Sequence, residues 1–226
     1  KFAANVNLYR TLWKDRFLSQ RFESQAGSNF YASILGVNAL HQGIEIDFTY
    51  KPLDNLSFYG MLSIGDWEWQ NDLVDVPVFD ENQEEIGTGK LYLKGAKVGD
   101  AAQTTALLGI DQKIGSNIRV DLDYRFVDGL YADYSITDSA FTSPDNDGAL
   151  KLPSFGLLDL GATFFANNGW SLRGNINNLL DTTYIAESNS NIHATADSTT
   201  WKGVDTRNSV WFGFGRTWNV SLKYKF

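Results

Sequence analysis

Three groups of aromatic and polar residues carry side chains that could act on a ligand. Trp67 and Trp69 flank Glu68, and two further groups lie later in the chain. These hold Tyr131, Asp133 and Tyr134, and then Asn189, Asn191, His193 and Trp201. Trp and Tyr rings can stack on a sugar, a siderophore or a peptide while polar neighbours fix the orientation. Aromatic residues at strand ends are equally typical of a membrane interface, so both interpretations stay open.

Catalysis and metal binding have little support. His41 and His193 are the two histidines, and they stand without a zinc spacing or a recognisable nucleophile arrangement. An acidic stretch could collect calcium, but its spacing matches no EF-hand, which favours a solvated loop. Its members are Asp72, Asp75, Asp80, Glu81, Glu84 and Glu85. We therefore expect no enzyme, no metal and no cofactor.

The composition excludes further classes. The 226 residues include no Cys, so disulfides and thiolate sites are absent, and the formal net charge is -8. Nucleic acid is not expected as a partner, because phosphate binding needs a clustered basic surface. No run of about 18 apolar residues occurs, whereas a membrane-spanning strand needs only about 9 to 11 alternating residues. The chain begins at Lys1 in strand-like sequence, so we expect it to be a piece of a longer protein.

Strict alternation of polar and apolar residues is the strongest pattern. At the carboxyl end, Trp218, Val220, Leu222, Tyr224 and Phe226 share one face, because side chains of a strand alternate with period two. Eight segments show such alternation, the first weakly. They lie at residues 4–9, 43–51, 56–66, 104–113, 118–126, 155–166, 170–177 and 217–226. The pattern predicts an all-β protein with antiparallel strands.

The connections between these segments are short and long in turn. Long loops are expected at about residues 18–40, 70–100, 128–153 and 181–209, with tight turns between them. This regularity is typical of a transmembrane β-barrel, while a soluble sandwich is the alternative. The barrel also predicts two aromatic girdles. Phe58, Trp170, Tyr224 and Phe226 would form the turn-side girdle, and Trp13, Trp67, Trp69, Tyr131 and Trp218 the loop-side one.

The polar faces of the strands carry charges that would be costly in lipid. Arg at the bilayer midplane costs about 2 to 4 kcal/mol, so these side chains are expected to face a lumen. Opposite charges on neighbouring strands would also pair with one another. The charged residues are Glu45, Asp47, Arg119, Asp121, Asp123, Arg125 and Arg173.

Several short sequence motifs resemble those of a known protein family. The segment NINNLLDTTY at 175–184 is similar to the penultimate-strand signature of TonB-dependent outer-membrane transporters, and GFGRT at 213–217 stands where that family introduces its terminal strand. LPSF at 152–155 resembles the preceding strand. GAKVGDAAQ at 95–103 is similar to a pattern of such receptors from Bacteroidota-like bacteria.

The resemblance implies a 22-stranded barrel with a plugged lumen, in the outer membrane of a Gram-negative bacterium. Residues 1–226 would be the carboxyl-terminal portion of that barrel, about eight strands, without the plug domain. The implied function is import of a scarce nutrient driven through TonB. The implied partners are the plug, whose surface the charged lumen residues would contact, the remaining strands, the TonB complex and outer-membrane lipid.

Several alternatives stay open. An autonomous eight-stranded barrel with a structural or adhesive role is geometrically possible, and an outer-membrane enzyme is a weaker option. The substrate is open among iron chelates, cobalamin, glycans and peptides, and so is a surface lipoprotein that would cap the barrel. From the resemblance, the expected ligand-binding residues in the outer loops are Trp67, Trp69, Tyr131, Tyr134, His193 and Trp201.

Overall fold

The computed structural model of the chain describes residues 1–23, 29–134, 141–166 and 168–226. Over these residues the fold is built from β-strands, in agreement with the all-β prediction. No helix in this part of the chain is long and apolar enough to cross a membrane.

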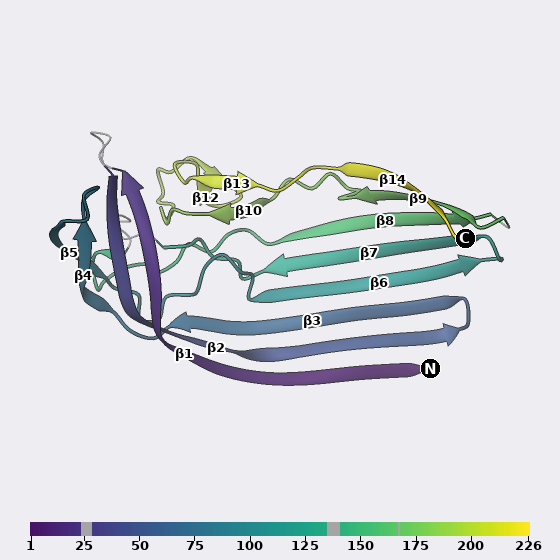
Figure 1. Ribbon diagram of the computed structural model, residues 1–226, viewed down its shortest axis with the longest axis horizontal. Helices are drawn as coiled ribbons and strands as arrows, with labels where there is room; N and C mark the ends of the chain where they lie inside the picture. Colours follow the sequence, from purple (N-terminus) through teal and green to yellow (C-terminus); the bar gives the residue numbers. More distant parts are fainter. Residues whose placement is uncertain (24–28, 135–140, 167) are drawn as a thin grey trace.

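Eight long antiparallel strands form one curved wall (Figure 1). Each strand pairs with the next along the wall through a continuous ladder. In order they are β1 (Phe2–Glu23), β2 (Asn29–Leu53), β3 (Leu56–Trp69), β6 (Thr104–Ile114), β7 (Ile118–Asp128), β8 (Phe155–Phe165), β9 (Trp170–Asn177) and β14 (Thr217–Tyr224). The expectation of eight alternating strands is confirmed.

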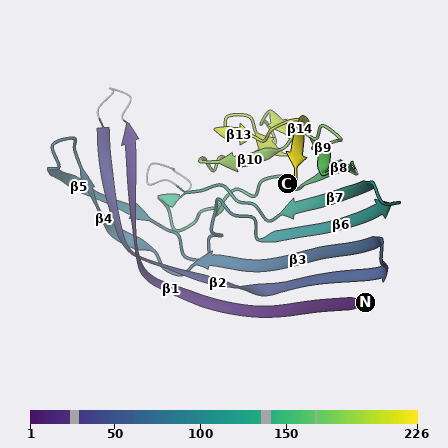
Figure 2. The same ribbon diagram turned by 45° about the vertical axis from the view of Figure 1, so that its right-hand side comes forward.

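The wall has two edges that do not meet. Over the described residues, β1 pairs with β2 alone and β14 with β9 alone. Figure 2 foreshortens β8, β9 and β14 while β3, β6 and β7 stay nearly in the plane, so the sheet curves without closing. A closed barrel made by these eight strands alone is therefore contradicted.

Tight turns and long connections lie at opposite ends of the wall (Figure 1). Both chain termini lie at the turn end. Gly115 and Gly169 sit in two of these turns with φ values of 61° and 88°, a left-handed conformation that favours glycine. At the other end, the connections from β3 to β6, from β7 to β8 and from β9 to β14 are long, as the sequence predicts.

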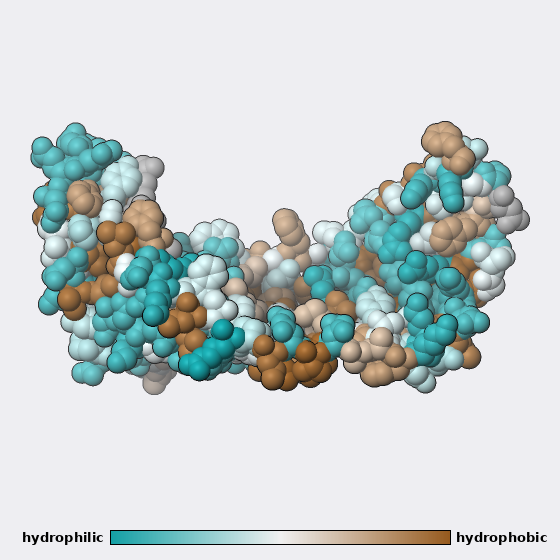
Figure 3. All heavy atoms as spheres, turned by 60° about the horizontal axis from the view of Figure 1, so that its bottom comes forward, coloured by the Kyte–Doolittle hydropathy of each residue, from teal (hydrophilic) through white to brown (hydrophobic). Residues whose placement is uncertain are grey.

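The two faces of the wall differ in polarity. Leu8 pairs with Ile44 and Ile44 with Ile64, and the same apolar face continues across the wall to Trp218. Val6, Leu8, Leu108, Val220 and Leu222 each expose more than half of their surface on this face. In the space-filling view, hydrophobic side chains gather at the middle of the lower edge of the molecule, on the side away from the hollow between two raised ends (Figure 3).

The opposite face carries a ladder of side-chain bonds, here called the polar ladder, that join neighbouring strands or reach across one intervening strand. Every one of the seven charged residues expected to face a lumen takes part in it. The bonds join Asn5 to Asp47 (2.8 Å), Asn7 to Glu45 (3.0 Å), Tyr59 to Asp123 (2.5 Å), Arg119 to Asp111, Arg125 to Asp159 (2.8 Å), and Arg173 to Asp121 (2.7 and 2.8 Å). Pairing between strands satisfies these charges on one side of the sheet.

The first two strands are much longer than the sequence pattern suggests. β1 and β2 pair almost continuously through residues 18–23 and 29–40, so the loop expected at 18–40 is wrong. Gly36, at a φ of 80°, and register shifts of β1 between Trp13 and Leu18 interrupt the alternation there. Because of this interruption, a search for strict alternation with period two does not detect these parts of the strands.

Two of the long connections contain short strands. β4 (Leu73–Phe79) and β5 (Glu85–Leu91) form a hairpin, and β4 pairs with the loop end of β2. The last long connection holds β10 (Ile185–Ser188), β11 (Thr200–Trp201), β12 (Val204–Asp205) and β13 (Val210–Phe212). The loop end is therefore a folded region, here called the outer region.

The aromatic girdles are confirmed at one end only. At the turn end the ring centroids of Tyr50 and Phe58 lie 6.4 Å apart and those of Trp170 and Tyr224 lie 4.8 Å apart. At the loop end Trp218 lies on the apolar face. Trp67 stacks on His41 on the polar face, Trp13 lies beside that ring and Trp69 is buried, so an outer girdle that includes these three is wrong.

We predict that Arg173→Met lowers the stability of the full-length protein by about 1–3 kcal/mol, because Asp121 then keeps a largely shielded charge without its bidentate partner. Thermal unfolding in detergent gives the comparison. Lys223→Met, which removes an exposed cation from the neighbouring strand, is the matched control and should change stability by less than about 0.5 kcal/mol. Equal effects of the two changes would contradict a structural role for the polar ladder.

Candidate ligand-binding surface in the outer region

Two hydrophobic clusters give the outer region its own interior. The first joins β2 to the β4–β5 hairpin and to two later connections. Its fully or nearly fully buried members are Ala32, Ile34, Val37, Ala39, Trp69, Val76, Leu91, Leu93, Ala96, Tyr134 and Phe141. The second joins the last two long connections through Leu130, Ala132, Leu150, Leu152, Ile185 and Val204. Burial of these apolar side chains holds the connections in defined positions.

Two of the six expected ligand-binding residues belong to the first cluster. Trp69 is 4% exposed and Tyr134 is 6% exposed, and their rings meet edge to face with centroids 5.4 Å apart. The Arg16 guanidinium lies 5.5 Å from the Trp69 ring centroid. Both rings are thus packed inside the protein and offer little surface to a ligand.

Trp67 lies on the polar face at the loop end of β3. Its ring stacks on His41 with centroids 5.1 Å apart, and its Nε1 donates a hydrogen bond of 2.8 Å to the hydroxyl of Tyr9. A Cβ at Gly43 or Gly65 would come within 3 Å of the Tyr9 or Trp67 side chain. The two glycines therefore let these rings lie flat against the wall, half-buried and facing the concave side.

The other three expected residues lie on two connections. Tyr131 forms an isolated bridge with Lys151, and His193 donates from Nε2 to the carbonyl of Gly148 at 3.0 Å. Trp201 packs edge to face on Phe212, and the Lys202 ammonium lies 4.7 Å from its ring centroid. Of the six expected residues, the structure brings Trp69 and Tyr134 into contact. It also joins the connection between β7 and β8, which carries Tyr131, to the connection between β9 and β14, which carries His193.

Asn191 has a structural role that its position in the sequence does not reveal. Its Oδ1 accepts from the Leu150 amide at 2.8 Å, and its Nδ2 donates to the Asp133 carbonyl at 2.7 Å. The Asp133 amide in turn donates to Ser188. These bonds fasten the connection after β7 to the one after β9. Sequence spacing could not find them, because the partners are more than 40 residues apart.

Carboxylates of three connections approach one another beside this junction. Burial, together with the charges of Asp100 and Glu187, raises the pKa of Asp133 to about 6. In the same outer region, hydrogen bonds from Arg207 and Ser198 hold the pKa of Asp205 well below its usual range. Asp205 therefore stays ionised, whereas Asp133 changes its charge near neutral pH.

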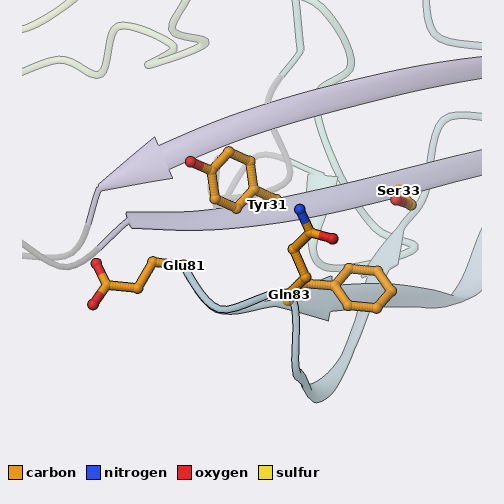
Figure 4. Close-up of a pocket in the computed structure, with 5 residues that line it drawn as sticks. Tyr31, Ser33, Glu81 and Gln83 are labelled. Atoms are coloured by element: carbon orange, nitrogen blue, oxygen red, sulfur yellow. The ribbon is translucent and has the colours of Figure 1, made fainter.

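A pocket of about 350 Å³ opens between β2 and the β4–β5 hairpin (Figure 4). Tyr31, Ser33, Phe79, Glu81 and Gln83 line it, so it combines aromatic and polar groups. Sequence analysis missed this pocket, because it depends on pairing of Tyr31 with Phe79, which only the long β2 brings together.

Two carboxylates of the acidic stretch accept hydrogen bonds from backbone amides. Oδ1 of Asp72 accepts from the Lys94 amide, and Oδ1 of Asp80 accepts from the amides of Asn82 and Glu84, each bond 2.8–2.9 Å long. Over the residues that the structure describes, no group of three or more His, Cys, Asp or Glu side chains could hold a metal ion.

We predict that Asp133→Asn changes how stability depends on pH. Folding raises the pKa of Asp133 from 3.8 to about 6, so its stabilising contribution is complete below pH 3.8 and falls as the pH rises through 6. Between pH 5 and pH 7.5 the wild type should lose about 1 kcal/mol relative to the Asn variant. Thermal unfolding at both values tests this, with exposed Asp197→Asn as the control. Parallel pH profiles for all three proteins would refute it.

Comparisons with known proteins agree with this architecture. The solved structures to which the chain is similar include the copper transporter OprC, with a TM-score of 0.63 and 15% identity over 100% of this chain and 29% of OprC. FpvA of P. aeruginosa, bound to a heterologous pyoverdine with iron, gives 0.58 and 14% over 100% of this chain and 25% of FpvA. The siderophore receptor PiuA from Acinetobacter baumannii gives 0.58 and 16% over 98% and 25%.

The chain thus spans between a quarter and a third of the length of these neighbours, which share its fold. No curated protein matches it by sequence. The family model described as TonB dependent receptor-like, beta-barrel matches residues 1–179, well over half of the chain. The chain therefore belongs to the TonB-dependent receptor family as part of its β-barrel, which lies in the outer membrane of Gram-negative bacteria.

Proposed function

We propose that this chain is the carboxyl-terminal part of the barrel of a receptor that imports a scarce nutrient across the outer membrane, driven through TonB. The observation that carries the proposal is the open eight-stranded wall with a charged and bonded concave face, in a chain of this family. Strands with open edges in lipid leave backbone groups unpaired, so further strands are needed to complete the barrel.

The proposed partners follow from the two faces. The apolar face contacts outer-membrane lipid. A plug domain of the same protein fills the lumen and lies against the polar ladder, where Arg125 and Arg173 still expose 49% and 36% of their side chains. The TonB complex acts through an amino-terminal part outside this chain. A surface lipoprotein that covers the outer region is a further candidate partner.

The proposed substrate is a scarce nutrient such as an iron chelate, cobalamin, a glycan or a peptide. The names of the neighbours support a metal or a metal chelate, since OprC is a copper transporter and PiuA a siderophore receptor. Trp67, Tyr131, His193 and Trp201 are only partly buried and remain our candidates for contact with it. The family is one of receptors, which is consistent with the expected lack of catalysis.

The alternative of an autonomous structural or adhesive barrel has less support. Its eight strands would have to close on themselves, and β1 and β14 do not pair. The alternative of an outer-membrane enzyme also lacks support, because the described residues show no cluster of side chains of a catalytic type.

Import driven through TonB makes a direct genetic prediction. Deleting the gene that encodes the full-length receptor should abolish growth on the limiting nutrient, tested among ferric chelates, copper, cobalamin, glycans and peptides as sole sources. Deleting tonB should abolish it equally, while excess nutrient restores growth in both strains. Uptake that needs the receptor but persists without TonB would contradict the proposed coupling.

Trp67 and Trp69 should differ sharply when each is replaced by Ala in the full-length receptor. Loss of the partly exposed Trp67 ring should lower uptake of the limiting nutrient about tenfold with a small change in melting temperature, because the proposed stacking contact with the nutrient is lost. Loss of the buried Trp69 ring should cost about 3–5 kcal/mol of stability. Uptake that is unchanged in Trp67→Ala would remove Trp67 from the binding surface.

A further inference from the structure

Three adjacent rows of side chains on the apolar face of β8, β9 and β14 differ in size. The register of the strands places a row of small or short residues between two rows of large ones. The middle row is Ala162, Gly174 and Val220, and the flanking rows are Leu160, Ile176 and Trp218 on one side and Phe164, Leu172 and Leu222 on the other. A groove crosses the strands here, and its apolar lining is the middle row together with the row of Leu160, Ile176 and Trp218.

The groove has a volume of about 340 Å³. Its side-chain lining is apolar. Asn175 and Asn219 also border the groove, but their side chains lie on the opposite face of the sheet, where Nδ2 of Asn175 donates to Oδ1 of Asn219 at 2.8 Å. Rows on one face of a sheet are about 7 Å apart, so a short middle row leaves a channel wide enough for a hydrocarbon chain. Trp218, 75% exposed, forms the wall nearest the outer region.

Gly174 keeps the groove open. No atom lies within 4 Å of a Cβ built at this position, and its φ is outside the left-handed region. Neither the backbone nor a neighbouring side chain therefore requires glycine there. Glycine in the interior of a strand weakens the sheet. The stability of the sheet therefore does not explain why Gly174 leaves this space open.

We propose that this groove binds one acyl chain of an outer-membrane lipid. The groove is continuous with the exposed apolar face that the barrel turns toward lipid, opposite the polar ladder, and hydrocarbon is what the membrane supplies at that depth. The chain lies across β8, β9 and β14, over Gly174 and against Trp218. The proposal depends on the outer-membrane location of the family and is independent of what the receptor imports.

Native mass spectrometry of the full-length receptor tests the proposal. The protein is delipidated in detergent and titrated with dipalmitoylphosphatidylethanolamine, which gives the Kd of each successive lipid. The first lipid should bind about tenfold more tightly than the later ones, since burial of two methylenes suffices for that factor. Gly174→Leu should abolish the difference, and Gly174→Ala should reduce it.

Ala106→Leu is the matched control, because Ala106 lies on the same apolar face of β6 and outside the groove. It should keep the tight first lipid. Trp218→Ala, which removes one wall without filling the groove, should also weaken the first lipid and covers the case that Gly174→Leu fails to fold. A first Kd unchanged by Gly174→Leu and Trp218→Ala, or weakened equally by Ala106→Leu, would overturn the proposal.

Discussion

Backbone groups inside a membrane must find hydrogen-bond partners, and the rest of the structure depends on how the wall meets this constraint. From β2 to β9 each strand of the wall satisfies its neighbours on both sides. At β1 and β14 one row of amides and carbonyls stays open over the described residues. Open rows cannot end in hydrocarbon, so the wall acquires a function only as part of a larger closed barrel.

Once the strands are paired, alternation decides which face meets lipid. The polar ladder gathers the charges on one side, where Arg173 and Asp121 bridge strands through two bonds. Large apolar side chains such as Leu8 and Leu222 remain exposed on the other side. The outer region follows a different rule, because its connections have no lipid to face. They bury Ile34, Phe141 and Leu152 in clusters of their own, and Asn191 fastens two of them together.

The sequence predicts the spanning wall well because period two is visible wherever one face meets lipid and the other does not. It fails where tertiary packing takes over. At the loop end of β2, Ala32 and Ile34 are buried before the Gly36 irregularity, and Val37 and Ala39 after it, so the buried face changes from even to odd positions. No single period describes such a strand. The burial of Trp69 against Tyr134 likewise depends on residues 65 positions apart, which no local pattern reveals.

The mass of the native polypeptide tests the central claim most directly. Intact mass spectrometry of the protein from purified outer membranes should give several times the 25.3 kDa of this chain, because the wall needs further strands to close. A native mass equal to that of the chain would contradict the account. It would mean that eight strands satisfy both open edges in some other way.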